Sequence, residues 1–168
     1  MGKQRGRALM MIVVTSSAIV AACASGSPDP TQMSRAAVAR GLSLADDAKS
    51  RVSQSYQAGG MKGLKAAASA WNARYGGVGA TSEYVESVLI NIDTGEIAIR
   101  YSASLPEVRG KTLVLSPNLP VGTVLVEGLT GTIEWACISA TNRTAVTQGF
   151  HFLTAGTVPA QYAPAQCQ

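Results

Sequence analysis

Residues 84–101 read YVESVLINIDTGEIAIRY, and this stretch decides the fold class. β-branched and aromatic residues dominate its two halves, residues 84–92 and 96–101, which favours strands. Between the halves stands Asp93-Thr94-Gly95, a short run of residue types that bend a chain sharply. The stretch therefore predicts two antiparallel strands joined as a β-hairpin.

Two more strands are expected further along the chain. Residues 111–115 form an apolar run that Pro117 ends, because proline cannot donate to a strand ladder. Residues 132–138 form the other run, and the apolar residues 121–126 are a candidate for a short additional strand between them. The sheet should therefore have three or four antiparallel strands.

A long amphipathic helix is expected before the sheet, over Thr31–Tyr56. Its apolar residues recur every three or four positions; they are Val38, Leu42, Ala45, Ala48, Val52 and Tyr56. Asp29 can cap the helix and Pro30 suits its first position, because the N–H that proline lacks is unpaired in a first turn. Gly59-Gly60 should stop it.

Residues 64–71 predict a second short helix, closed by Gly76-Gly77. One long helix followed by antiparallel strands indicates an α+β domain, in which the helix covers one face of the sheet. The domain should span residues 31–168. At 168 residues, 46% hydrophobic and 14% charged, the chain is large enough to bury a core of this kind.

The N-terminus predicts an export segment over residues 1–24. Lys3, Arg5 and Arg7 precede an apolar run, Ala8–Ala22, which is shorter than a spanning helix requires. A linker rich in Ser, Gly and Pro follows over residues 25–30. Without the three leader cations the formal charge of +4 falls to +1, which argues against a nucleic-acid surface.

Cys23 is a candidate site of lipidation. Val20-Ala21-Ala22-Cys23 resembles a bacterial lipobox, in which the thiol receives a diacylglycerol and becomes the first residue of the mature protein. The alternative is a small apolar cysteine inside a signal helix.

The two other cysteines, Cys137 and Cys167, can form a disulfide, because exported proteins reach oxidising compartments. The bridge would close a loop of about 31 residues and contribute about 3–4 kcal/mol. Residues 140–168 show no clear period, so we expect a loop that the disulfide holds.

The order of these elements resembles the type IV pilins, and specific stretches agree over residues 35–167. In the helix they are Arg35, Val38, Gly41-Leu42-Ser43-Leu44-Ala45, Ala48-Lys49, Val52 and Tyr56. In the sheet they are Tyr84-Val85, Ser87-Val88, Gly95-Glu96-Ile97, Gly110-Lys111-Thr112-Leu113, Leu115, Pro117 and Ile133-Glu134-Trp135-Ala136-Cys137. At the end they are Val158-Pro159-Ala160-Gln161-Tyr162, Pro164 and Cys167.

The resemblance implies an exported structural and adhesive protein of the pilus or cell envelope. Its partners would be other pilin subunits or the pilus machinery, a host or abiotic surface through the loop of residues 138–166, and the membrane through the N-terminus. Trp135 should fill the core, because an indole on a strand buries a large apolar area. Tyr162 and Pro164 should pack the tail onto the sheet.

The N-terminus departs from the pilin pattern. Pilins have a glycine at the cleavage site and a glutamate at the fifth residue of the apolar helix, which neutralises a neighbour's N-terminal amine. Here Gly6 and the run Met11-Ile12-Val13-Val14 match that segment weakly, and the glutamate position falls on Met11 or on Leu9. A buried amine without a carboxylate is costly, so the resemblance does not extend to the usual route of polymerisation.

An enzyme is not expected, and neither is a metal or cofactor. The single histidine, His151, lies between two phenylalanines and has no nucleophile beside it, which indicates a surface or packing role. Asp46 and Asp47 are neighbours on a helix and diverge, so they make no acid–base pair. Asn142-Arg143-Thr144 matches the N-glycosylation pattern, which also arises by chance.

Two alternatives to a pilus subunit stay open at this point. A lipid-anchored envelope protein would keep the pilin head as a non-polymerising interaction module, as Cys23 and the missing glutamate favour. A secreted binding protein would use the same head without an anchor.

Overall fold

The computed structural model describes residues 29–168 of the chain. Its helices are α1 (Pro30–Leu44), α2 (Asp46–Asn72) and α3 (Arg143–Thr147). Its strands are β1 (Val85–Ile90), β2 (Ile97–Tyr101), β3 (Thr112–Leu119), β4 (Thr123–Val124) and β5 (Glu134–Ile138). The predicted leader, residues 1–24, and residues 25–28 of the predicted linker lie outside the described residues.

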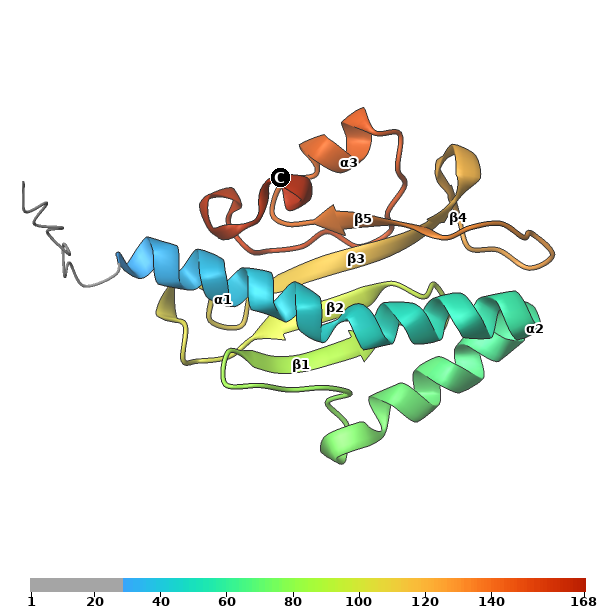
Figure 1. Cartoon of the computed structure of the whole chain (residues 1–168), viewed down its shortest axis with the longest axis horizontal. Coiled ribbons are helices and arrows are strands. Elements are labelled where there is room, and N and C mark those ends of the chain that lie inside the picture. Colours follow the sequence, from blue (N-terminus) through green and yellow to red (C-terminus); the bar gives the residue numbers. More distant parts are fainter. Residues whose placement is uncertain (1–28) are drawn as a thin grey trace, which may run out of the picture.

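Helix α1 and the first part of α2 lie end to end across one face of the sheet (Figure 1). Only Ala45 separates them, and its φ of −83° and ψ of −5° keep it in the right-handed helical region. The expected single helix over residues 31–56 is therefore divided there without a sharp bend. The predicted start is confirmed, since Thr31 N donates to Asp29 Oδ1 at 3.0 Å and Pro30 is the first helical residue.

Two glycines then reverse the chain inside α2. Gly60 has a φ of 56° and a ψ of −149°, a conformation that only glycine adopts readily, and Gly59 is also non-helical. The second part of α2 returns beneath the first (Figure 1), and Glu127 Oε2 caps it by accepting from Met61 N at 3.2 Å. The sequence predicted this break and a second helix over 64–71, which the structure lengthens to Met61–Asn72.

The sheet is antiparallel throughout, and β3 is its central strand. β2 pairs with β3 up to Leu115 and β4 pairs with it from Asn118, while β5 pairs with the opposite side of β3. Between Leu115 and Asn118, no strand formed by residues 29–168 pairs with β3 on the β2 side. The prediction that Pro117 ends this strand is wrong, because a proline is tolerated in a strand where one side has no partner.

The other strand predictions hold with changed bounds. The hairpin of β1 and β2 is confirmed, but its connection spans residues 91–96 and is organised by Asn91, whose Oδ1 accepts from the N–H groups of Asp93 and Thr94. The run 121–126 contributes only the two residues of β4, and the run 132–138 becomes β5.

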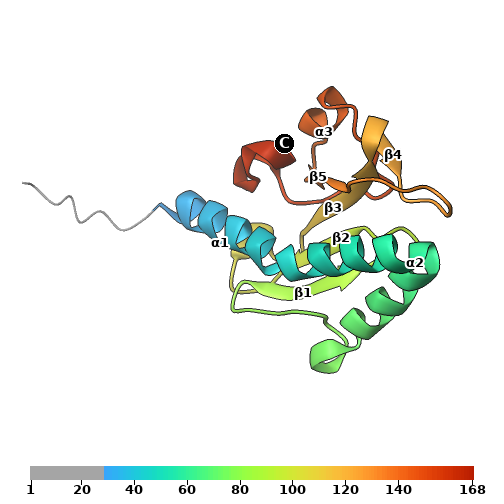
Figure 2. The same cartoon turned by 45° about the vertical axis from the view of Figure 1, so that its right-hand side comes forward.

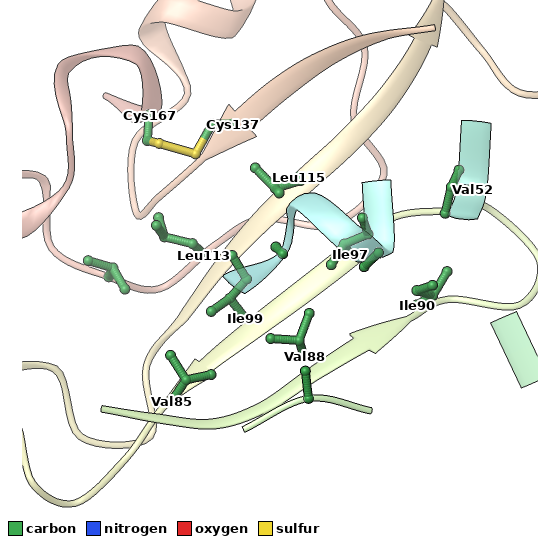
Figure 3. Close-up of a cluster of buried hydrophobic side chains, with 14 of the residues drawn as sticks. Val52, Val85, Val88, Ile90, Ile97, Ile99, Leu113, Leu115, Cys137 and Cys167 are labelled. Atoms are coloured by element: carbon green, nitrogen blue, oxygen red, sulfur yellow. A yellow bond between two sulfur atoms is a disulfide. The ribbon is translucent and has the colours of Figure 1, made fainter. Parts of the chain in front are cut away.

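The main core lies between the helices and the sheet. On the helix side, cross-strand neighbours form two apolar rows, Val88–Ile99–Leu113 and Ile90–Ile97–Leu115 (Figure 3). Helix residues Val38, Val52 and Leu64 are fully buried against this layer. Burying one such side chain contributes about 1.5–3 kcal/mol, so these rows fix which face of the sheet the helix covers.

Helix α1 lies close to the sheet at Gly41. Tyr101 of β2 is fully buried, and its hydroxyl donates to Val38 O at 2.8 Å. A Cβ at Gly41 would lie 2.6 Å from that hydroxyl oxygen, so glycine makes room for the tyrosine. Burial raises the pKa of Tyr101 well above its usual range.

Candidate functional site

The candidate site is the part of the chain that the disulfide encloses, residues 138–166, here called the disulfide segment. Cys137 at the end of β5 is bonded to Cys167, and their Cα atoms lie 4.5 Å apart. Both cysteines are buried and belong to the main core (Figure 3). The predicted bridge is therefore present, and it joins the end of the segment to the sheet.

The disulfide segment contacts both faces of the sheet. It leaves β5, carries α3 over the side away from α1 and α2, and returns toward α1 (Figure 2). On the outer face, Phe150 and Phe152 pack against a small second core, whose buried members are Val114, Ala136, Ile138 and Ala145. Near its end, Val158 and Ala163 enter the main core. The expected irregular loop is thus an ordered wrap that contains a short helix.

One buried amide fixes the middle of the segment. Asn118 is fully buried on β3, and its Nδ2 donates to His151 O while its Oδ1 accepts from His151 N, both at 2.9 Å. Ser116 Oγ also donates to His151 O, at 3.2 Å. These bonds use only the backbone of His151. The residue as a whole is exposed.

One buried carboxylate fixes the next residues. Glu96 is only 4% exposed, and its Oε1 accepts from Leu153 N at 2.7 Å and from Thr154 N at 3.1 Å. Its Oε2 accepts from Thr154 Oγ1 at 2.7 Å. Sequence reasoning missed this role, although a carboxylate between Gly95 and an apolar strand is a signal of a buried acceptor.

The aromatic residues near the disulfide have mixed positions. Trp135 is half-buried and packs against the main core, so the expected core role holds only for part of the ring. It borders a groove with Lys49 of α2 and Gln166. Tyr162 is half-buried against the main core, as expected.

The outward surface of the segment is partly apolar. Leu153 is 64% exposed and Val146 on α3 is 59% exposed. Asn142 and Arg143, at the start of α3, are also exposed. Such a mixture of apolar and polar groups on an ordered backbone suits contact with another surface. Within residues 29–168 no group of His, Cys, Asp and Glu side chains is placed to hold a metal ion.

A second surface lies along α1. Met33 is 52% exposed, and Ala36 and Arg40 are also exposed. Two grooves border this surface, of about 140 and 510 Å³, and Arg40 and Tyr84 line both. None of the helices in residues 29–168 has the length and apolar character needed to cross a membrane.

The fold and the site thus combine a long helix on an antiparallel sheet with a wrapped segment that a disulfide closes. The family model described as Pilin (bacterial filament) matches residues 34–168. A crystal structure of a type IV pilin from Pseudomonas aeruginosa strain Pa110594 is 41% identical, with a TM-score of 0.75, and the match covers 83% of this chain and all of that one. The chain therefore belongs to the pilin family, as a type IV pilin. The comparison with curated proteins found no match.

Members of this family are structural subunits that assemble with other pilin subunits into a pilus, and they are exported to the cell surface or envelope. The matched region begins at Ser34, close to the start of α1. The candidate lipidation site Cys23 and the apolar run before it lie outside the described residues.

Proposed function

We propose that this pilin acts in adhesion, in pilus-dependent motility or in both, with α1 as its assembly surface and the disulfide segment as its contact surface. The observation that carries the proposal is that the part of the segment around α3 lies on the other side of the sheet from α1, although the end of the segment returns to α1 at Gln161 (Figure 2). A subunit can then be packed by its neighbours on one side and still present the other.

The exposed side of α1 supports assembly. Met33 and Ala36 are exposed there, while Ala37 and Val38 are buried against the domain. An apolar residue that is half exposed on a helix gains free energy when a second helix covers it. The grooves beside Arg40 and Tyr84 would receive side chains of a neighbouring subunit.

The disulfide segment supports surface contact because it is ordered before it binds anything. Asn118, Glu96 and the disulfide fix its backbone at three places. A surface that is already ordered loses less conformational entropy on binding. Its exposed apolar residues, Leu153 and Val146, are the candidates for direct contact with a host or abiotic surface.

Two substitutions of the same kind test this division. We would express Met33→Glu and Val146→Glu in a strain that lacks its own major pilin, and count filaments by electron microscopy. Both residues are exposed, so neither change should unfold the domain. Met33→Glu should abolish filaments, whereas Val146→Glu should leave them and reduce attachment to surfaces. Normal filaments from Met33→Glu would contradict the assembly surface.

A second candidate function is a lipid-anchored envelope protein that keeps the pilin head without polymerising. Val20-Ala21-Ala22-Cys23 supports it, and so does the absence of glutamate at Leu9 and Met11. Mass spectrometry of the mature N-terminus separates the candidates. A methylated residue after Gly6 indicates a pilus subunit, a diacylglycerol on Cys23 indicates the anchored protein, and a plain terminus near Ala24 indicates secretion.

A further inference from the structure

A groove of about 500 Å³ lies on the outer face of the sheet, beside the connection of β1 to β2. Its floor contains Leu89, Ala98 and Val114, which are cross-strand neighbours in one row. Ile138 ends this row on β5 and is fully buried under the disulfide segment. Leu89 and Ala98 are partly exposed, so the segment covers the row only from Val114 onward. The groove lies over the part of this row that the disulfide segment leaves uncovered.

Polar groups surround this apolar floor. They are Asn72, Asn91, Asp93, Glu96 and Thr154. Asn72 is occupied, since its amide bonds to both the N–H and the carbonyl of Ile90. Asn91 uses its Oδ1 within the turn, and its Nδ2 has no partner among residues 29–168. A ligand in the groove therefore meets amide, hydroxyl and carboxylate groups around an apolar surface.

Glu96 gives the groove its charge. Its carboxylate is buried, yet none of the ion pairs in residues 29–168 includes it. It accepts three hydrogen bonds, and a carboxylate has about four acceptor positions, so one position remains on Oε2. At the rim, Lys65 pairs with Asp93 at 3.2 Å and balances that charge. One uncompensated negative charge remains at the edge of the groove.

We propose that this groove binds an amino sugar, with its primary ammonium group on Glu96 and the face of its ring on Ala98 and Leu89. A cation that pairs with Glu96 offsets the cost of burying an unpaired carboxylate. The volume suits one or two sugar rings, and an apolar floor with a few polar groups is the usual composition of such sites. The negative charge disfavours acidic sugars and nucleic acids.

Amino-sugar binding would supply a ligand for the adhesion proposed above, and it rests on the proposed function only for its part in adhesion. Binding at the groove needs neither a filament nor an anchor. Loss of amino-sugar binding would leave filament counts unchanged, and loss of filaments through Met33→Glu would leave binding unchanged. The two can therefore fail separately.

The test measures binding to the full-length protein by calorimetry with two matched disaccharides. The first is the β-1,4-linked disaccharide of glucosamine, and the second is the same disaccharide with both amines acetylated, which removes the charge and keeps the rings. We expect the first to bind and the second to bind at least about tenfold more weakly, as for the loss of one hydrogen bond to a charged group. Equal binding of the two, or no binding, overturns the proposal.

Two variants locate the site. Glu96→Gln keeps the shape and can keep the bonds to Leu153 and Thr154, so the fold should survive while affinity falls by about tenfold or more. Should that variant fail to fold, Ala98→Leu fills the floor from a partly exposed position and should also abolish binding. Glu86→Gln on β1, whose partner is Arg100 and which does not line the groove, is the matched control and should change nothing.

A third probe tests the sugar itself. Putrescine carries primary ammonium groups without a ring, so it can pair with Glu96 but cannot cover Ala98 and Leu89. Weaker binding of putrescine than of the glucosamine disaccharide is the expected result. Tighter binding of putrescine would overturn the assignment of a sugar. Binding that persists in both Glu96→Gln and Ala98→Leu would overturn the site.

Discussion

Replacing Gly41 with alanine should destabilise the domain, although alanine is the better helix former. A Cβ at this position would lie 2.6 Å from Tyr101 Oη and 2.9 Å from Tyr101 Cε1, closer than side-chain atoms can pack. Tyr101 is fully buried between α1 and the sheet, so its ring has little room to move away. The helix or the ring must shift, and the hydroxyl then loses Val38 O as its acceptor.

The magnitude follows from three contributions. Overpacking costs about 1–3 kcal/mol, and a buried hydroxyl that loses its partner costs about 1–3 kcal/mol. The higher helix propensity of alanine relative to glycine offsets about 1 kcal/mol of this loss. The three contributions sum to a loss of about 1–5 kcal/mol, with a central value of about 3 kcal/mol, in the free energy of unfolding. For a domain of this size the central value corresponds to a fall in Tm of about 5–10 °C.

Thermal unfolding followed by circular dichroism measures this effect, and Gly59→Ala is the control. A Cβ at Gly59 meets nothing within 4 Å, so that variant creates no clash with a neighbouring side chain and should lower Tm less than Gly41→Ala does. Tyr101→Phe removes the nearest atom and should recover part of the loss when it is combined with Gly41→Ala. A Gly41→Ala variant as stable as the parent would refute the close approach of α1 to β2.

Three further predictions concern the disulfide segment and the buried tyrosine. Replacing both Cys137 and Cys167 with serine should lower the free energy of unfolding by about 3–4 kcal/mol in denaturant titration and speed proteolysis within the segment. Asn118→Ala leaves the backbone of His151 without its partners and should cost about 2–3 kcal/mol, with faster hydrogen exchange at His151 N. Burial raises the pKa of Tyr101 above the value of 10 found in unfolded chains, so the folded state keeps a proton that the unfolded state loses. Stability should then be complete below pH 10 and fall above it by up to about 1.4 kcal/mol per pH unit, and Tyr101→Phe should reduce that slope.

Features with a local cause were predictable from the sequence. Asp29 and Pro30 set the start of α1 through bonds within one turn, and Gly60 sets the reversal in α2 through its own backbone freedom. The hairpin followed from residue types in a single stretch of eighteen residues. Cys137 and Cys167 could be paired because the third cysteine lies in the leader.

Features with a distant cause were not predictable. Pro117 stays inside β3 because β2 and β4 leave a gap beside it, and nothing near Pro117 in the sequence reports that gap. Asn118 and Glu96 bond to residues 33 to 58 positions away. Their role depends on how the disulfide segment crosses the sheet, which residue patterns within one segment do not encode.

The groove, too, was predictable only in part, because one of its features has a local cause and the other depends on distant packing. The row Leu89–Ala98–Val114–Ile138 could be read as the outer face of strands, but the sequence did not show that the segment covers only half of it. Thr154, which bonds to Glu96, marks where the cover stops. Because the cover by the disulfide segment stops at this point, the apolar floor of the groove stays open beside the buried carboxylate of Glu96.

The polar groups that fix the disulfide segment, Asn118 and Glu96, belong to the sheet. The backbone path of the segment therefore depends little on the segment's own exposed side chains. Asn118 and Glu96 bind backbone N–H and carbonyl groups of residues 151–154 almost entirely, so they specify the path of the chain with little regard to its side chains. Leu153 can therefore change without loss of the bond from its N–H to Glu96. The exposed side chains are left free to set what the segment contacts, while β2 and β3 keep its backbone in place. Substitutions at the exposed positions of the segment should therefore cost little stability, because the bonds that hold its backbone do not involve their side chains.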